Sequence, residues 1–309
     1  MTTYSWNPID GVSEFFGNLA KQICQNLYQG LYDGIEEQFN SIADTMNTGI
    51  AAANQTVTTK PQDWNGAAFS FIRGVAENAC IPIAACILTF IFCWEVIHLA
   101  QESNQMHNIK PETILMLMLK LGICLFVCSK SFEIVNGLFD VAAWASEKVN
   151  AAAAGADSPV SLADMGLARE LPEYTMGHVF KMLANFLLTF FAKLIIYAIT
   201  IAITLRVNLW YLELLVYASA APIPFSTFIN KEWGQMGTNY TRKMMAVAFE
   251  GFFMLVVFGL YEALSRNVLS ASGTDAYMAG MATTCGCGIA LFLMLGKIGN
   301  ISASIFNAH

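Results

Sequence analysis

The sequence predicts an all-α, polytopic membrane protein with about five transmembrane helices, a re-entrant or broken helix and an N-terminal amphipathic helical region. Of its 309 residues, 56% are hydrophobic and only 13% are charged, whereas soluble domains carry about 25% charged residues. Several apolar stretches reach the length of about 20 residues that a helix needs to cross a bilayer. The net charge of −7 argues against a protein whose main task is to bind phosphate backbones.

Apolar side chains recur at helical spacing between Val12 and Ile50, which predicts one or two amphipathic helices over about residues 9–56. Acidic residues interrupt the pattern too often for a membrane span, and Gly30 and Gly34 weaken a single long helix. Because the polar face is acidic, anionic lipid is disfavoured, so we expect a partner protein on this stripe, or alternatively packing on the protein's own chain. Residues 57–75 are expected to form a connection, and residues 1–75 to lie outside the cytoplasm.

The rest of the chain, residues 76–309, is predicted to be a transmembrane domain with an external loop over residues 145–175. Five stretches are expected to cross the membrane, the second of which can continue as a helix beyond it. They are Ile81–Ala100, Ile114–Cys128, the first part of Met176–Phe228, Met244–Leu264 and Ala276–Gly296.

The apolar run that ends at Phe228 is longer than one span and meets Pro222 and Pro224 near its end. Proline removes a backbone donor and interrupts helical hydrogen bonding. Irregular backbone at membrane depth is tolerated only where protein or a water-filled cavity covers it. The segment 207–230 is therefore predicted to be either a complete span with a broken end or a re-entrant segment.

Positive charge gives an orientation for these spans. Lys231, Arg242 and Lys243 form the densest short cationic cluster, and short cationic loops favour the cytoplasm. With that loop inside, the chain has five full spans and a re-entrant segment, its N-terminus is outside and its C-terminus is cytoplasmic. Six simple spans, with the cluster outside, are the alternative.

Charged side chains within apolar runs are further candidates for function, because such residues usually face the bundle interior or water. Lys120, Arg206 and Glu250 are predicted as pore-lining or interior charges, although Arg206 could instead snorkel to the interface. Glu95 and His98, one turn apart, are read as an interfacial pair. No metal or cofactor is expected, and Cys285-Gly-Cys287 lacks the two-residue spacer of a redox or zinc pair.

Small residues recur every four positions along the last predicted span and are typical of close helix packing, within the chain or between subunits. The residues predicted for this role are Gly280, Thr284, Gly286 and Gly288. A phosphate-binding loop of the form G-x-x-x-x-G-K-[ST] does not occur in the sequence, and no nucleophile–base motif is evident. An enzyme is therefore not expected.

The stretch from Trp210 to Leu264 combines a glutamate in an apolar helix, the Pro222-Ile-Pro224 break and the motif "NKEWGQMGTNY". In these features it resembles the TrbL/VirB-type membrane proteins of conjugative type IV secretion systems, in the form carried by conjugative elements of Gram-positive bacteria. The terminal "ISASIFNAH" is similar too. The resemblance covers roughly residues 80–309 and is concentrated in residues 206–266. The shared signature consists of Glu213, Pro222, Pro224, Glu232, Trp233, Gly234, Tyr240 and Lys243.

The resemblance implies a platform or channel subunit that helps to translocate a DNA–protein substrate across the bacterial cytoplasmic membrane. Its implied partners are membrane lipid, further copies of the chain in a ring such as a pentamer, and other secretion components including ATPases. Transient contact with the transferred DNA is also implied. A secondary transporter or another multi-pass carrier is the alternative, because such proteins use broken helices and midplane charges in a similar way.

Overall fold

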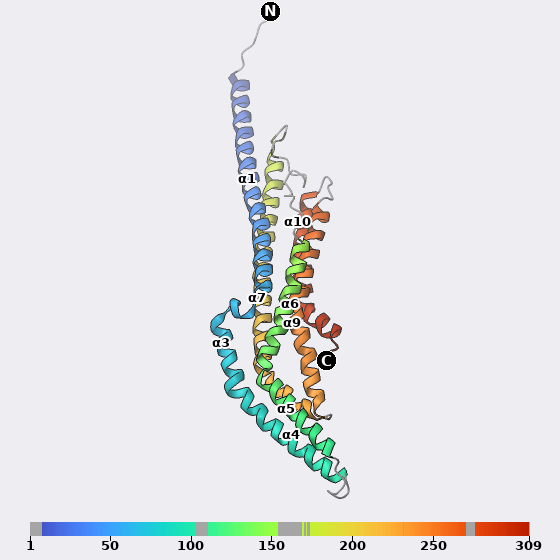
Figure 1. The fold of residues 1–309 in the computed structure, drawn as a ribbon. Coiled ribbons are helices and arrows are strands. Elements are labelled where there is room, and N and C mark those ends of the chain that lie inside the picture. Colours follow the sequence, from blue (N-terminus) through green and yellow to red (C-terminus); the bar gives the residue numbers. More distant parts are fainter. Residues whose placement is uncertain are drawn as a thin grey trace, which may run out of the picture. The chain divides into compact units, whose positions relative to one another are not determined.

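The computed structural model describes residues 8–102, 111–153, 169, 171, 174–230, 232–269 and 276–308, and within this part of the chain the regular structure is entirely helical. The elements appear in Figure 1 in chain order. They are α1 (Pro8–Thr58), α2 (Pro61–Trp64), α3 (Gly66–Val75), the π-helical turn η1 (Ala76–Cys80), α4 (Ile81–Glu102), α5 (Pro111–Ser129), α6 (Ser131–Ala153), α7 (Met176–Ala220), α8 (Pro222–Phe225), the 3-10 turn η3 (Ser226–Ile229), α9 (Gly234–Leu269) and α10 (Ala276–Ile305).

Among the described residues, five helical segments are long and apolar enough to cross a membrane, which confirms the predicted fold class. They are Gly66–Gln101, Pro111–Ser129, Met176–Ile229, Gly234–Tyr261 and Tyr277–Ile305. The stretch 207–220 is the last part of α7, so it does not begin a separate span, and this count of five does not support the alternative of six. The helix breaks directly before Pro222, as the two prolines predict.

The predicted connection over residues 57–75 is wrong for its second half, which is helical. Pro61 stands at the first position of α2, where its missing N–H costs nothing. The Asn65 side chain accepts a hydrogen bond from the Ala68 N–H at 3.0 Å and caps α3. Pro61 and Gly66 therefore mark helix starts, although they read as breakers in the sequence.

The first helix, α1, is a single helix of 51 residues that Gly30 and Gly34 do not interrupt. From Ile35 onward its apolar stripe is buried against the protein's own chain. The expectation of a partner protein on this stripe is therefore wrong for that part, and the alternative of packing on the same chain is correct. Nearer the N-terminus, Val12, Phe16 and Leu19 are exposed, and a partner there stays a prediction.

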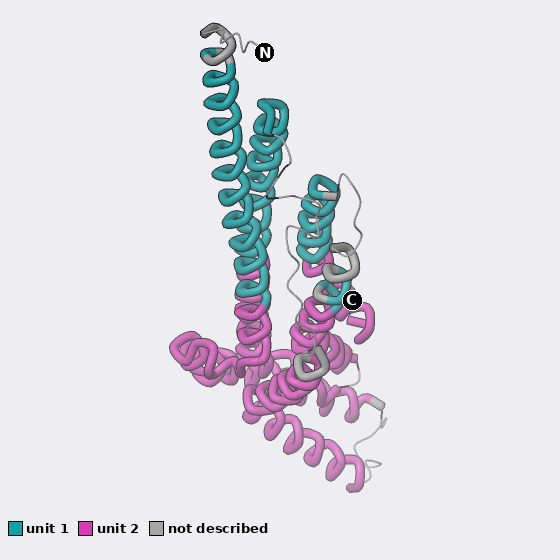
Figure 2. The backbone as a smooth tube through the Cα atoms, turned by 90° about the horizontal axis from the view of Figure 1, so that it is seen from above, with its two compact units in different colours: residues 1–50, 156–202, 260–292 teal, residues 51–155, 203–259, 293–309 magenta. Residues whose placement is uncertain are grey.

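The chain folds into two compact units, which Figure 2 distinguishes by colour. Unit 1 consists of residues 1–50, 156–202 and 260–292, and unit 2 of residues 51–155, 203–259 and 293–309. In unit 2, α6 continues to Ala153 and so occupies the beginning of the predicted external loop 145–175. Most of the remaining loop and Lys231 lie outside the described residues.

Glycines allow α1, α7 and α10 to approach closely in unit 1. A Cβ at Gly34 would lie 2.9 Å from Phe186 Cε2, and a Cβ at Gly49 would overlap the methyl group of Thr200. On α10, Gly288 faces two isoleucines of α7. Gly286 is exposed, and a Cβ at that position would have no other atom within 4 Å. Of these two predicted packing residues, Gly288 is thus used inside the chain, whereas Gly286 is open.

The contrast between two glycines of α1 gives a stability test. We expect Gly49→Ala to destabilise the protein by about 1–3 kcal/mol, because the added methyl group overpacks the contact with Thr200. The matched control Gly30→Ala adds its methyl group to open space and should be neutral or stabilising by up to about 1 kcal/mol. Thermal unfolding in detergent measures both, and equal stability of the two variants would contradict the packing described.

Candidate functional site

The segment between α7 and α9, residues 221–230, is called the proline break below. Its elements α8 and η3 pack against α4 and α5. Eight of its residues are buried: Ala221, Pro222, Pro224, Phe225, Ser226, Thr227, Ile229 and Asn230. Non-helical backbone is thereby covered by protein, which is the condition under which a membrane tolerates it.

Two thiols of α5 contribute to this cover. Cys124 Sγ donates to the carbonyl oxygen of Phe225 at 3.3 Å, and Cys128 Sγ lies 3.7 Å from the carbonyl oxygen of Pro222. Within the break, the Thr227 hydroxyl donates to the carbonyl oxygen of Pro224 at 2.7 Å. An S–H group is a weak donor that tolerates apolar surroundings. Because Cys124 and Cys128 are four residues apart, they lie on the same face of α5, where they can contact both the carbonyl groups of the break and apolar neighbours.

Asn230 connects the break to the start of α9. Its side-chain oxygen accepts hydrogen bonds from the Glu232 N–H at 2.7 Å and from the Trp233 N–H at 3.3 Å. These two backbone donors lie just before α9 and have no partner within the helix. Its side-chain amide donates to Glu95 Oε2 of α4 at 2.6 Å. Glu95, which the sequence suggests as an interfacial partner of His98, therefore fixes the residue that leads into α9.

Gly237 lets the first turn of α9 touch the break. A Cβ at this position would lie 2.8 Å from the carbonyl oxygen of Pro224 and 2.8 Å from Phe228 Cε1. Its N–H donates to the Thr227 hydroxyl at 3.2 Å. Any larger residue would push α9 away from this carbonyl, so the position requires glycine for space.

A second group of residues forms what we call the charged cavity, a space of about 220 Å³ in unit 2. Its charged lining is Arg206 and Glu213 of α7 with Lys243 and Glu250 of α9. Arg206 forms an ion pair with Glu250, whose side chain is only 3% exposed. Because a buried carboxylate is costly without a partner, this ion pair is required for Glu250 to be charged where it lies.

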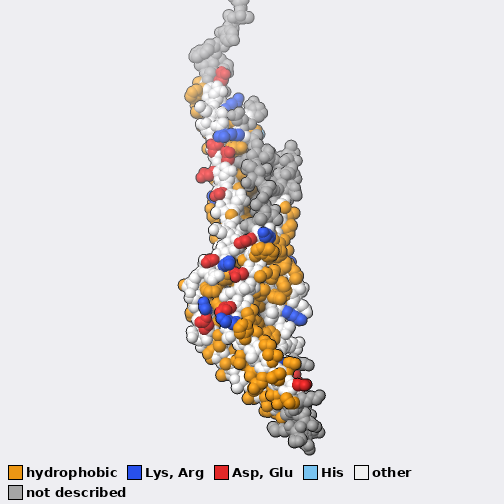
Figure 3. Space-filling model, viewed as in Figure 1, with side chains coloured by type: hydrophobic (Ala, Val, Ile, Leu, Met, Phe, Trp, Pro, Cys, Tyr) orange, Lys and Arg blue, Asp and Glu red, His pale blue; other side chains and the backbone are white. Residues whose placement is uncertain are grey.

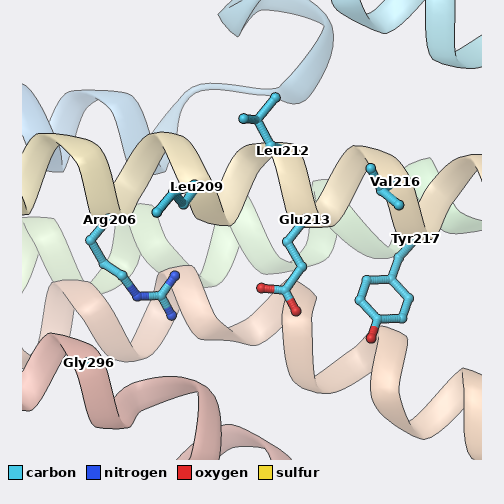
Figure 4. Close-up of a pocket in the computed structure, with 7 residues that line it drawn as sticks. All are labelled: Arg206, Leu209, Leu212, Glu213, Val216, Tyr217 and Gly296. Atoms are coloured by element: carbon cyan, nitrogen blue, oxygen red, sulfur yellow. The ribbon is translucent and has the colours of Figure 1, made fainter.

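The register of the antiparallel α7–α9 hairpin brings these four charges together. Arg206 and Glu213 are seven residues apart on α7, and Lys243 and Glu250 are seven residues apart on α9, so both pairs recur after two turns. Between them the Trp210 indole donates to the carbonyl oxygen of Val247 at 2.7 Å. Figure 4 shows Arg206 and Glu213 extending from the same side of α7.

One further contact continues the same register. The Tyr240 hydroxyl donates to the carbonyl oxygen of Tyr217, one turn beyond Glu213 and Lys243. Tyr240 also packs edge-on against Phe225 of the proline break, with ring centroids 5.6 Å apart. The break and the charged cavity are therefore joined through this tyrosine.

Glycines of α9 and α10 make room for the charged cavity. A Cβ at Gly299 would lie 3.2 Å from Glu250 Oε1, and one at Gly251 would lie 2.7 Å from the Trp210 ring. Beside the cavity, an open and largely apolar groove of about 620 Å³ shares Arg206, Glu213 and Gly296 with it. Figure 4 labels its lining: Arg206, Leu209, Leu212, Glu213, Val216, Tyr217 and Gly296.

All eight residues of the sequence signature lie in unit 2, at the break, at the cavity or where α9 begins. By contrast, Lys120 is exposed on α5 and does not line the cavity, whereas Arg206 and Glu250 do. Sequence reasoning missed three contributors altogether: Cys124, Cys128 and Gly299. Asn230 and Gly237 belong to the motif "NKEWGQMGTNY", but the sequence assigned neither of them a role.

Comparison with protein families gives one match. A family model described as TrbL/VirB6 plasmid conjugal transfer like protein matches residues 46–222, which is more than half of the chain. The match includes Arg206, Glu213 and the first proline of the break. No curated protein and no solved structure gave a significant match.

Gly237→Ala tests the packing of the proline break. We expect the added methyl group to displace the break from α9, at a cost of about 1–3 kcal/mol, and to expose the buried thiols of Cys124 and Cys128. Alkylation of these two cysteines by a maleimide, followed by mass spectrometry of the peptides, should become several-fold faster. The control Gly296→Ala adds a methyl group to open space and should leave the rate unchanged; equal rates in both variants would refute this role for Gly237.

Exchange of charge tests the ion pair of the cavity. Arg206→Glu and Glu250→Arg should each lower stability by about 3–5 kcal/mol, because each buries like charges together. The double variant restores opposite charges and should recover a large part of this loss in thermal unfolding. If the two losses simply add, Arg206 and Glu250 do not interact as described.

Proposed function

Because the chain belongs to the TrbL/VirB6 plasmid conjugal transfer-like family, we propose that it is a platform or channel subunit of a conjugative type IV secretion system. It helps to move a DNA–protein substrate across the cytoplasmic membrane. The observation that carries the proposal is the family match over residues 46–222 in a chain with five candidate spans among its described residues. The protein is thus a multi-pass membrane protein of a conjugal transfer family.

The geometry of unit 2 supports a structural role in preference to catalysis. The signature residues form the proline break, the start of α9 and the charged lining of the cavity. In each of these places they position the backbone or another charged side chain. Pro222 and Pro224 form the break, and Glu213 and Lys243 line the cavity. We therefore propose a conduit or scaffold that acts with separate ATPases and is not itself an enzyme.

The proposed arrangement in the membrane follows from the cationic residues after the break. With Arg242 and Lys243 toward the cytoplasm, the N-terminus lies outside and the C-terminus inside. Further copies of the chain form a ring, for example a pentamer, surrounded by the lipid of the bacterial inner membrane. Other secretion components bind this ring, and transferred DNA contacts it only transiently.

A secondary transporter stays the second candidate, because a broken helix next to a charged cavity is also typical of transporter sites. In a transporter the cavity would bind the solute between Arg206 and Glu213. Uptake of solutes into vesicles that contain only the purified protein separates the two functions. A secretion subunit should give no concentrative uptake driven by a proton or sodium gradient.

Deletion of the gene in the donor cell tests the preferred function most directly. We expect conjugative transfer to fall to the background of the mating assay, and expression of the intact chain to restore it. Gly30→Ala, whose methyl group meets open space, should restore transfer equally well. Undiminished transfer from a deletion strain that still makes the ATPases would refute the proposed role.

A further inference from the structure

Two charges of the charged cavity have no ion-pair partner within the described part of the chain. The four charged side chains of its lining sum to zero, and Arg206 is paired with Glu250. Glu213 of α7 and Lys243 of α9 line the same space, are partly buried and form no ion pair with a described residue. The cavity therefore presents one carboxylate and one ammonium group that are open to a ligand.

The size and the charge of this space suit a small zwitterion. Its volume of about 220 Å³ is several times the volume of about 30 Å³ that one water molecule takes up in the liquid. Charged groups withdrawn from bulk water are costly unless opposite charges and hydrogen bonds compensate them. A group that carries both signs of charge compensates Glu213 and Lys243 at once, whereas a simple anion or cation compensates only one of them.

The cationic side chains of the lining favour a phosphate as the negative end of such a zwitterion. A guanidinium group has five N–H donors in a planar fork that matches phosphate oxygens. Arg206 directs one of its nitrogens to Glu250 Oε1, so further donors stay available. Lys243 adds an ammonium group on the same cavity. Phosphate oxygens can therefore accept from both side chains while Glu213 accepts from the positive end.

The groove beside the cavity adds an apolar extension to this site. It has a volume of about 620 Å³ and shares three lining residues with the cavity. Its apolar lining includes Leu209, Leu212 and Val216, whose side chains are exposed. Figure 4 shows Arg206 and Glu213 pointing to one side of α7 and Leu212 to the other. A ligand that fills both spaces thus has a charged end and an apolar tail.

Acyl chains are the apolar tails that a membrane supplies to such a groove. Unit 2 exposes large apolar side chains on α4 and α5 as well, for example Phe90, Leu115 and Phe126. Figure 3 shows hydrophobic side chains gathered over these two helices. Since the chain has helices that are apolar and long enough to cross a bilayer, phospholipids are always next to this surface and can enter the open groove from the side.

We propose that the charged cavity and this groove together bind a phospholipid with a zwitterionic headgroup of the phosphoethanolamine type. Its phosphate accepts hydrogen bonds from Arg206 and Lys243, and its ammonium group donates to Glu213. One acyl chain lies along Leu209 and Val216. The inference goes beyond the proposed secretion role and needs only a protein that is embedded in a membrane.

The same chemistry separates this headgroup from others. A phosphoglycerol headgroup has no cation for Glu213, and a phosphocholine headgroup has a cation without N–H donors. Charge-assisted hydrogen bonds are the strong ones, so both lipids lose the contact with Glu213. A soluble phosphoethanolamine compound has the right charges but no tail for the groove, and burial of a tail contributes about 0.8 kcal/mol for each CH₂ group.

Lipid binding to the purified full chain tests the proposal. The protein is freed of bound lipid in detergent, and the dissociation constants are measured by native mass spectrometry. The probes are phosphatidylethanolamine, phosphatidylcholine and phosphatidylglycerol with identical acyl chains, and deacylated glycerophosphoethanolamine. We expect phosphatidylethanolamine to bind about tenfold more tightly than the other two lipids, and the deacylated compound to bind more weakly than any of the lipids.

Two substitutions assign the charges. Glu213→Gln should weaken phosphatidylethanolamine binding about tenfold and leave phosphatidylglycerol binding unchanged or tighter. Lys243→Gln should weaken the binding of both. The control Lys120→Gln removes a charge that is exposed on α5 and does not line the cavity, so it should change neither constant. Thermal unfolding without lipid shows that each variant is folded, and the comparison of lipids on the unaltered chain needs no variant.

Three results would overturn the inference. Equal affinity for the three lipids, or phosphatidylethanolamine binding that Glu213→Gln does not weaken, would exclude recognition of a zwitterionic headgroup by this cavity. If glycerophosphoethanolamine binds as tightly as the lipid, the ligand is a soluble zwitterion and the groove holds no acyl chain. Because these measurements need no secretion machinery, they can fail while the mating assay still supports the proposed function, and they can succeed where that assay fails.

Discussion

The rest of unit 2 depends on one constraint: backbone that leaves the helical hydrogen-bonding pattern inside a membrane must be covered by protein. Pro222 and Pro224 create this need, and neighbouring elements meet it. The thiol of Cys124 reaches the carbonyl oxygen of Phe225, while Asn230 serves the N–H groups ahead of α9 and is held by Glu95. These contacts make α4 and α5 part of the break, because without them its backbone groups would meet lipid.

The charged cavity follows from the same turn. Once the break reverses the chain, α9 runs back along α7, and its register is set by large side chains such as Trp210, which reaches Val247, and Tyr240, which reaches Tyr217. This register places Glu250 against Arg206. A buried ion pair is weak evidence for stability, but it discriminates strongly against other registers, because a shift would leave a charge without a partner. The pair therefore serves mainly to specify how the hairpin closes.

In unit 1 as well, glycines allow helices to approach closely. Glycines bring α1 against α7 and α10, and this packing buries the apolar stripe of α1 from Ile35 onward. What α1 then offers to its surroundings is a polar, acidic face, whereas α7 offers an apolar one.

The sequence by itself determined the helical class, the apolar spans and the position of the break, because hydropathy, periodicity and proline chemistry act on neighbouring residues. It also drew attention to Arg206, Glu213 and Glu250 as unusual charges. It misjudged residues 66–75, where Asn65 caps a helix, and the main packing partner of α1. Only the tertiary structure decided that Arg206 meets Glu250, that Asn230 meets Glu95 and that Gly237 must be small. Such pairings join residues up to 135 positions apart, and they depend on the register between helices, which no local pattern of residues specifies.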